Sequence, residues 1–259
     1  MARETKTINF LCAMPRSGNT LFASLLNQNP DLVVTPNSIT LEIMKTLWLL
    51  KDTDSFQNFP EEQSLNNIMN EVYTLYYKYW NYKVIIDRGP VCTPANLKVM
   101  QKYFKQPIRC VVLLRNVLDV LASYIKWFET EPTSFLNHYK TIDEKLNKVM
   151  AADGAVAKEL MSIQYLLHHP EMAVFIKYDD LVKNPEQELR KVYTFLNIPY
   201  FPHTFIDLDQ VIINGVQYND KVMGENMHTI RTEKIMKIDN EYKNKIPEKF
   251  VKEYGHINF

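Results

Sequence analysis

The segment Pro15-Arg16-Ser17-Gly18-Asn19-Thr20 decides how this chain begins to fold. It follows the apolar run 8–14 and precedes residues 21–26, whose apolar positions have helical spacing. A strand, a short turn and a helix in this order form a phosphate-binding loop, because the turn's backbone N–H groups and the partially positive helix N-terminus face one anion. We therefore predict a strand over residues 8–14, a helix over residues 19–28 and an anion site between them.

The cation of this loop differs from that of the Walker loop, G-x-x-x-x-G-K-[ST]. Ala13 takes the first glycine position, Gly18 takes the second, Asn19 replaces the lysine and Thr20 keeps the hydroxyl. Arg16 offers a cation one turn earlier. An ordinary kinase or ATPase would lack its central lysine here, whereas a plain strand-to-helix turn with one glycine would have the same pattern.

The composition is that of a soluble globular protein with no bulk charge. Among 259 residues, 46% are hydrophobic, and 30 Lys and Arg balance 30 Asp and Glu. This balance disfavours binding to nucleic acid through overall charge. The spacing of the three cysteines, Cys12, Cys92 and Cys110, matches no metal-ligand pattern, so we expect no metal. Cys12 and Cys110 fall in apolar runs, which predicts that their thiols are buried. With no signal peptide or membrane-length apolar run, we expect a cytoplasmic protein that contacts no membrane.

Short apolar runs alternate with helix-spaced segments along the chain. The expected strands cover residues 8–14, 32–34, 83–87, 109–114 and 173–178. The expected helices cover residues 19–28, 41–50, 65–80, 95–104, 117–128, 141–167 (mostly) and 185–196, with a loop over 51–62. This alternation predicts an α/β, three-layer P-loop-type fold with a central parallel sheet flanked by helices. We expect one domain over residues 1–259, in which the polar segment 197–259 covers the ligand site.

A second anion-binding element follows the fourth expected strand. Arg115 stands at the carboxyl end of that strand, and Ser123 lies about two helical turns later. In open α/β sheets, ligands bind outside the carboxyl ends of the strands. A guanidinium and a hydroxyl placed there can hold one phosphate, although an arginine that caps a helix and a buried serine would give the same pattern.

Together the two elements resemble the sulfotransferase family, whose donor is 3′-phosphoadenosine 5′-phosphosulfate (PAPS). The first element is similar to the family's 5′-phosphosulfate loop, P-R-S-G-[TN]-T-L. The second is similar to the 3′-phosphate motif R-[DN]-x-x-D-x-x-x-S, which Arg115, Asp119 and Ser123 match. The resemblance extends from about residue 8 to residue 231. It implies a PAPS-dependent enzyme that releases PAP, of the soluble bacterial or phage-like kind, or a truncated form of a membrane-anchored one.

The resemblance also implies which residues hold the nucleotide. It gives the tyrosine at the strand end, Tyr178, to the adenine, and it makes the loop around residues 224–231 a cover for the nucleotide. The implied nucleotide-binding residues are Arg16, Ser17, Gly18, Asn19, Thr20, Leu21, Arg115, Ser123, Tyr178, His228, Thr229, Ile230 and Arg231.

Sulfuryl transfer leaves negative charge on the departing oxygen, which fixed donors must stabilise. Arg16 is one candidate, and Arg88 is another because it stands where relatives often have a catalytic lysine. An arginine stays protonated, so Arg88 can stabilise charge but cannot act as an acid; an ion pair with a neighbouring carboxylate is its other interpretation. The base that receives the acceptor proton is open among Glu42, Asp87 and His228.

The acceptor is expected to be a small molecule, a sugar or a peptide. The regions 41–80 and 129–170 are rich in Tyr and Trp and are expected to shape its pocket, although such residues equally build a core. Two alternatives stay open. A P-loop nucleotide or small-molecule kinase fits Ile85-Ile86-Asp87, which resembles a Walker B strand, and its need for magnesium would reveal it. A non-catalytic nucleotide-binding protein would show no turnover.

Overall fold

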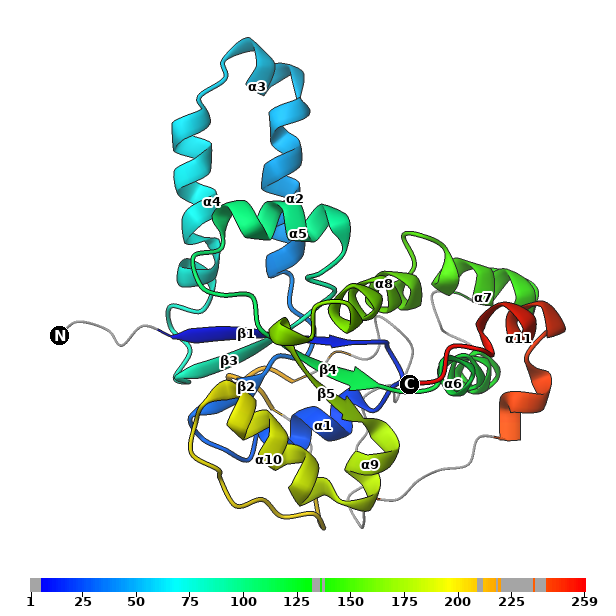
Figure 1. Cartoon of the computed structure of the whole chain (residues 1–259). Helices are drawn as coiled ribbons and strands as arrows, with labels where there is room; N and C mark the ends of the chain where they lie inside the picture. The colour runs from blue at the N-terminus through cyan, green and yellow to red at the C-terminus, as the bar shows by residue number, and fades with distance from the viewer. Residues whose placement is uncertain are drawn as a thin grey trace.

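One parallel sheet of five strands organises the molecule (Figure 1). The computed structural model describes residues 6–131, 136, 138–208, 212–217, 219, 235 and 241–259. The strands are β1 (Thr7–Ala13), β2 (Leu32–Val34), β3 (Val84–Arg88), β4 (Cys110–Leu114) and β5 (Ala173–Lys177). Their order across the sheet is β2-β3-β1-β4-β5, and every neighbouring pair is parallel. All carboxyl ends therefore meet at one edge, with the first strand in the centre.

Helices cover both faces of this sheet. The α-helices are α1 (Asn19–Leu26), α2 (Thr40–Leu49), α3 (Asp54–Asn58), α4 (Glu62–Tyr76), α5 (Pro94–Tyr103), α6 (Val117–Thr130), α7 (Ile142–Met150), α8 (Ala155–Leu167), α9 (Tyr178–Lys183), α10 (Pro185–Leu196) and α11 (Glu248–Tyr254). Short 3₁₀ turns are η1 (Leu50–Asp52), η2 (Pro170–Met172) and η4 (Glu241–Lys245). This architecture confirms the predicted α/β fold with a parallel sheet between helical layers.

The side-chain alternation of β1 divides the core into two halves. Phe10 and Cys12 point to one face, where they pack with residues of α2, α4, α5, α6 and α8. Leu11 and Ala13 point to the other face, where they pack with residues of α1 and α10. Because side chains of a strand alternate between faces, a strand that is buried at successive positions is covered on both faces, as β1 is after its first residue.

Three local predictions differ from the structure. The expected loop 51–62 contains η1 and α3, and Thr53 Oγ1 caps α3 by accepting from Phe56 N–H at 3.4 Å. The expected helix 141–167 is divided at Gly154, where a side chain would lie 2.3 Å from the Val149 carbonyl oxygen. Tyr178, expected at the end of a strand, begins the short helix α9. The first two differences involve a helix cap and a close backbone contact, which hydrophobic spacing does not register.

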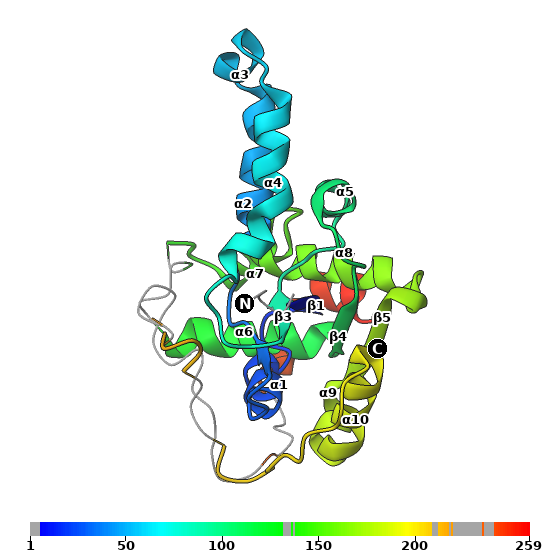
Figure 2. The same ribbon diagram turned by 90° about the vertical axis from the view of Figure 1, so that its left-hand side faces the viewer.

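Helices α2 and α4 project from the sheet, with α3 at their far end (Figures 1 and 2). The buried carboxylate of Asp87 ties the base of this projection to β3. It accepts hydrogen bonds from Thr35 Oγ1 at 3.2 Å, Thr40 Oγ1 at 2.5 Å and Tyr77 OH at 2.5 Å. Desolvation raises the pKa of Asp87, while these hydroxyl donors oppose the rise.

The described parts of the C-terminal segment follow two different surfaces. Thr204 exchanges hydrogen bonds with Gln28, just after α1, at 2.8 and 3.0 Å. Residues 241–259 instead pack beside α6, where Lys243 pairs with Asp119 and Phe250 is buried in the core. This segment therefore contacts the helix that carries the second predicted phosphate element.

Candidate nucleotide and active site

The loop after β1 has the backbone of an anion-binding turn. Arg16 (φ 67°) and Gly18 (φ 98°) both adopt left-handed conformations. A side chain at position 18 would lie 2.6 Å from the ring of Tyr178, so both the backbone angle and the close approach require glycine. Asn19 Nδ2 donates to the Met14 carbonyl at 3.0 Å, as does Ser17 Oγ at 2.5 Å. The asparagine that replaces the Walker lysine thus stabilises the loop through a buried hydrogen bond to its backbone.

The N-terminus of α1 is open to an anion. Gly18 is the N-cap and provides no side-chain cap, and no acidic residue lies in the first turn. The first N–H groups of a helix have no partner within it. Thr20 and Leu21 are half-buried in this first turn, so the hydroxyl and the backbone amides can face the same ligand.

The two predicted phosphate elements meet at Arg16. Its Nε donates to Ser123 Oγ on α6 at 3.2 Å, and its carbonyl accepts from Arg115 Nη1 at 3.0 Å. The Arg115 guanidinium also lies 4.3 Å from the centre of the Tyr178 ring. Arg115 and Ser123, which lie 99 and 107 positions after Arg16, thereby join it in one cationic cluster at the carboxyl edge.

Arg115 has a donor to spare. Its Nε is buried and has no hydrogen-bond partner among the described residues. A buried donor without a partner costs free energy, and an anion would remove that cost. The uncapped helix, the arginine pair and this unpartnered nitrogen fit a nucleotide that carries two separate phosphate groups.

A carboxylate that the sequence analysis missed lies next to the loop. Glu159 of α8 is buried, and its Oε2 accepts from the Ala13 N–H at 3.2 Å. Burial raises the pKa of Glu159 to about 8, although the positive charge of Arg88 and the Ala13 hydrogen bond lower it. The available signal was one glutamate within the apolar stripe of α8, between Val156 and Leu160.

Arg88 also lies at the carboxyl edge of the sheet, at the end of β3. The residue is half-buried, and its Nη1 donates to the Pro36 carbonyl at 3.1 Å. Buried Tyr124 of α6 lies close enough to Arg88 and Arg16 that both positive charges oppose the effect of desolvation, which raises its pKa to about 12. The predicted charge-stabilising arginines therefore lie around a common region.

The three expected bases lie in different settings. Glu42 is exposed in the first turn of α2. Asp87 is fully buried and already accepts three hydroxyl hydrogen bonds. His228, together with Thr229, Ile230 and Arg231, lies outside the described residues.

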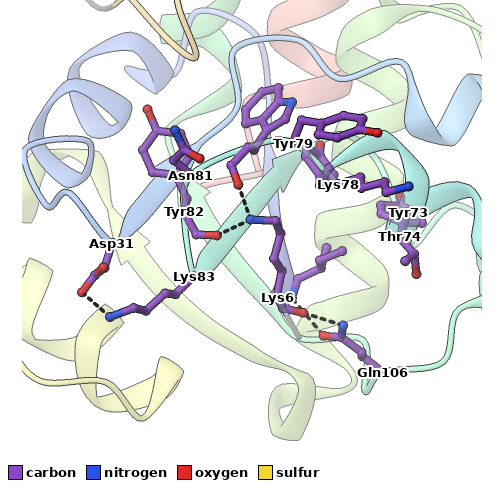
Figure 3. A pocket seen from close by; sticks show the side chains of 13 residues that line it. Lys6, Asp31, Tyr73, Thr74, Lys78, Tyr79, Asn81, Tyr82, Lys83 and Gln106 are labelled. Carbon is purple, nitrogen blue, oxygen red and sulfur yellow. Dashed lines mark hydrogen bonds and ion pairs between the residues drawn. The ribbon is translucent and has the colours of Figure 1, made fainter. Parts of the chain in front are cut away.

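Some aromatic residues of region 41–80 line a pocket at the opposite edge of the sheet. Figure 3 shows a pocket of about 560 Å³ at the amino ends of β1 and β3. Its aromatic lining consists of Tyr73, Tyr77, Tyr79, Trp80 and Tyr82. Lys6 donates there to the carbonyls of Trp80 and Tyr82. Tyr77 also reaches the Asp87 network, because its hydroxyl donates to Asp87 Oδ1 at 2.5 Å. That these aromatic residues shape the acceptor pocket stays a prediction.

Comparison with known proteins identifies the family. The model of the sulfotransferase domain matches residues 6–251. The chain belongs to the sulfotransferase family. The predicted family is thus confirmed.

Individual relatives of this sulfotransferase-family chain are distant. Flavonol 3-sulfotransferase of Flaveria bidentis is 24% identical over 204 residues, which is 74% of this chain and 57% of that protein. Similar solved structures include the sulfotransferase domain of the curacin biosynthetic pathway (TM-score 0.53, 19% identity, 99% of this chain and 93% of the other). Another is the sulfotransferase domain of the Synechococcus PCC 7002 olefin synthase (TM-score 0.54, 15% identity, 100% and 99%). These structures support the fold.

We searched the described residues for metal-ligand groups and for membrane-spanning helices. The described residues contain no group of three or more His, Cys, Asp or Glu side chains arranged for a metal ion. Along the same stretches, no helix has the length and apolarity needed to cross a bilayer. The three cysteines are free and buried, which confirms the predicted buried thiols at Cys12 and Cys110.

Proposed function

We propose that this protein transfers a sulfuryl group from PAPS to a hydroxyl or amine of a small molecule, sugar or peptide. The observation that carries the proposal is the meeting of the two phosphate elements, in which Arg16 donates to Ser123 and accepts from Arg115. One cluster can then hold the 5′-phosphosulfate at the loop and the 3′-phosphate at α6. Tyr178 packs beside both elements and is proposed to contact the nucleotide base.

The chain's own residues would act on charge and position. PAPS supplies a sulfuryl group attached to a phosphate oxygen. Arg16 and the amides of the loop would stabilise the charge that remains on that phosphate, and Arg88 would stabilise charge on the moving group. Holding both phosphates fixes the donor in one orientation and lowers the entropic cost of reaching the transition state.

Further proposals concern the surroundings of the site. Residues 241–259 pack beside α6, which supports the view that segment 197–259 covers the nucleotide as part of a single domain. We propose a cytoplasmic location, because three free cysteines suit a reducing compartment. The plant relative's name makes phenols the first acceptors to test.

The test is thermal unfolding with nucleotides. PAP should raise the melting temperature by mass action, ATP should raise it much less, and magnesium should not change either result. Equal stabilisation by ATP, or a requirement for magnesium, would favour the kinase alternative and contradict the proposal. Binding of PAP without turnover of PAPS with any phenol, alcohol or amine would favour a non-catalytic protein.

A further inference from the structure

Glu159 occupies the point where β1 and β3 separate at the carboxyl edge. Leu11 is paired with Arg88, and Gly89 N–H still donates to the Leu11 carbonyl at 3.1 Å. Pro90 comes next and has no N–H to continue the ladder. The Ala13 N–H is then left facing the gap, and Glu159 Oε2 accepts from it. A carboxyl group from α8 thus replaces the strand neighbour beside the phosphate loop.

A glutamate is a costly choice for this structural task. The residue is 6% exposed and lies between Val156 and Leu160, which are also buried. It forms no ion pair with any described residue. A buried carboxyl without an ion pair is destabilising when charged, and a glutamine would accept the same backbone hydrogen bond. Such a group next to a site indicates a chemical role.

The surroundings of Glu159 are those of a proton acceptor. One oxygen, Oε2, is held by Ala13, and the other, Oε1, accepts no hydrogen bond from a described residue. Arg88, a proposed charge-stabilising group, is close enough to act on Glu159 electrostatically without pairing with it. The titratable and charged groups that face Glu159 are Arg88 from the end of β3, Lys158 from α8, Cys92 after β3, Cys12 from β1 and Cys110 from β4.

We propose that Glu159 is the general base of this enzyme, a role that rests on the proposed sulfuryl transfer. The acceptor O–H bond breaks, and its proton moves to Oε1 of the ionised carboxyl group. A bond forms between the acceptor oxygen and sulfur, and the bond from sulfur to the 5′-phosphate oxygen breaks. The electron pair of that bond stays on the phosphate, so PAP leaves as the anion that Arg16 and the loop stabilise.

The raised pKa supports this role. A base works best when its pKa lies near the working pH, and burial brings Glu159 to about 8. Since the base must be ionised to act, the rate should rise with pH up to and through this value. Among the other candidates, Asp87 is saturated by hydroxyl donors, and Glu42 is an exposed side chain on α2.

The first experiment compares Glu159→Gln with a matched control. Glu188→Gln alters another buried glutamate, which lies on α10 and pairs with Lys191 away from the site. Enzyme in excess converts radiolabelled PAPS to PAP and sulfate with water as acceptor, between pH 6 and 9. We expect the wild-type and control rates to rise with a midpoint near 8, and Glu159→Gln to be on the order of a hundredfold slower and independent of pH. An unchanged rate or pH profile in Glu159→Gln, or an equal loss in the control, would overturn the proposal.

A second measurement requires no turnover. Infrared difference spectra should contain a carboxylic acid C=O band that titrates near pH 8 in the wild type and in Glu188→Gln, and that is absent in Glu159→Gln. Saturating PAP should move this titration to higher pH, because nearby phosphates disfavour the carboxylate. Absence of the band, or no response to PAP, would overturn the assignment. Failure of PAP to stabilise the wild type would instead contradict the proposed function, so the two failures are distinguishable.

Discussion

Two hydrogen-bond networks lie at the carboxyl edge of the sheet, and they differ in whether their polar groups are satisfied. The Asp87 network is closed, because Thr35, Thr40 and Tyr77 all donate to one buried carboxylate. The cationic cluster around Arg16 is open, because the buried Nε of Arg115 has no partner among the described residues and α1 has no side-chain cap. A closed network stabilises the fold, whereas an open network with surplus donors suits an anionic ligand.

Asp87→Ala should have the largest effect and should act on stability. It leaves the three hydroxyls without their acceptor, and hydrogen bonds to a charged group contribute about 1.5–3 kcal/mol each. We expect the free energy of unfolding in urea to fall by at least about 3 kcal/mol. Asp87→Asn, which keeps an acceptor oxygen, should lose less. If folded Asp87→Ala failed to bind PAP, the two networks would not be separate.

Arg88→Met should act on the rate and leave stability and nucleotide affinity nearly unchanged. Methionine keeps bulk but removes a donor whose charge we propose is used in the transition state. The single-turnover rate should fall on the order of a hundredfold, while PAP should raise the melting temperature as in the wild type. Arg190→Met, which alters an exposed arginine of α10, is the control. A full rate in Arg88→Met would contradict this map of the active site.

Arg115→Ala should weaken the binding of PAP by roughly 1.5–3 kcal/mol, which is the contribution of a hydrogen bond to a charged group. ADP, which lacks the 3′-phosphate, should bind nearly as it does to the wild type. Calorimetry with both ligands separates two roles of the side chain, because Arg115 also donates to the Arg16 carbonyl. Equal losses for PAP and ADP would show that it supports the loop instead. Ser123→Ala should follow the same pattern with a smaller loss, about 1 kcal/mol.

The smallest expected effect is the change in the free energy of unfolding per pH unit. The pKa of Glu159 is raised from 4.5 to about 8 by burial, so its neutral form is the one that the fold favours. The stability it provides is fully present below about pH 4.5 and is lost as the pH rises to about 8. The slope is at most about 1.4 kcal/mol per pH unit. Urea unfolding at pH 5, 6, 7 and 8 should show a shallower decline in Glu159→Gln than in the wild type; equal slopes would contradict the assignment.

Local sequence patterns were sufficient to predict the architecture and the residues that the two motifs bring to the carboxyl edge. Strand and helix periods predicted the five parallel strands, because alternation and helical spacing are properties of neighbouring residues. The two motifs predicted Arg16, Gly18, Arg115 and Ser123 at one edge, and the carboxyl ends of parallel strands bring them there. The sequence by itself thus determined the fold class, the family and the edge of the sheet at which the two motifs meet.

Only the tertiary structure decided which polar groups are satisfied. Ala13 and Glu159 are 146 positions apart, and Arg16 and Ser123 are 107 apart. Nothing in the local pattern of α8 states that its one buried carboxyl meets the end of β1. Asp87 had the sequence features of a reactive acid, yet three hydroxyls from other segments surround it. Burial and hydrogen-bond saturation depend on contacts between distant segments, and these contacts exist only once the chain has folded.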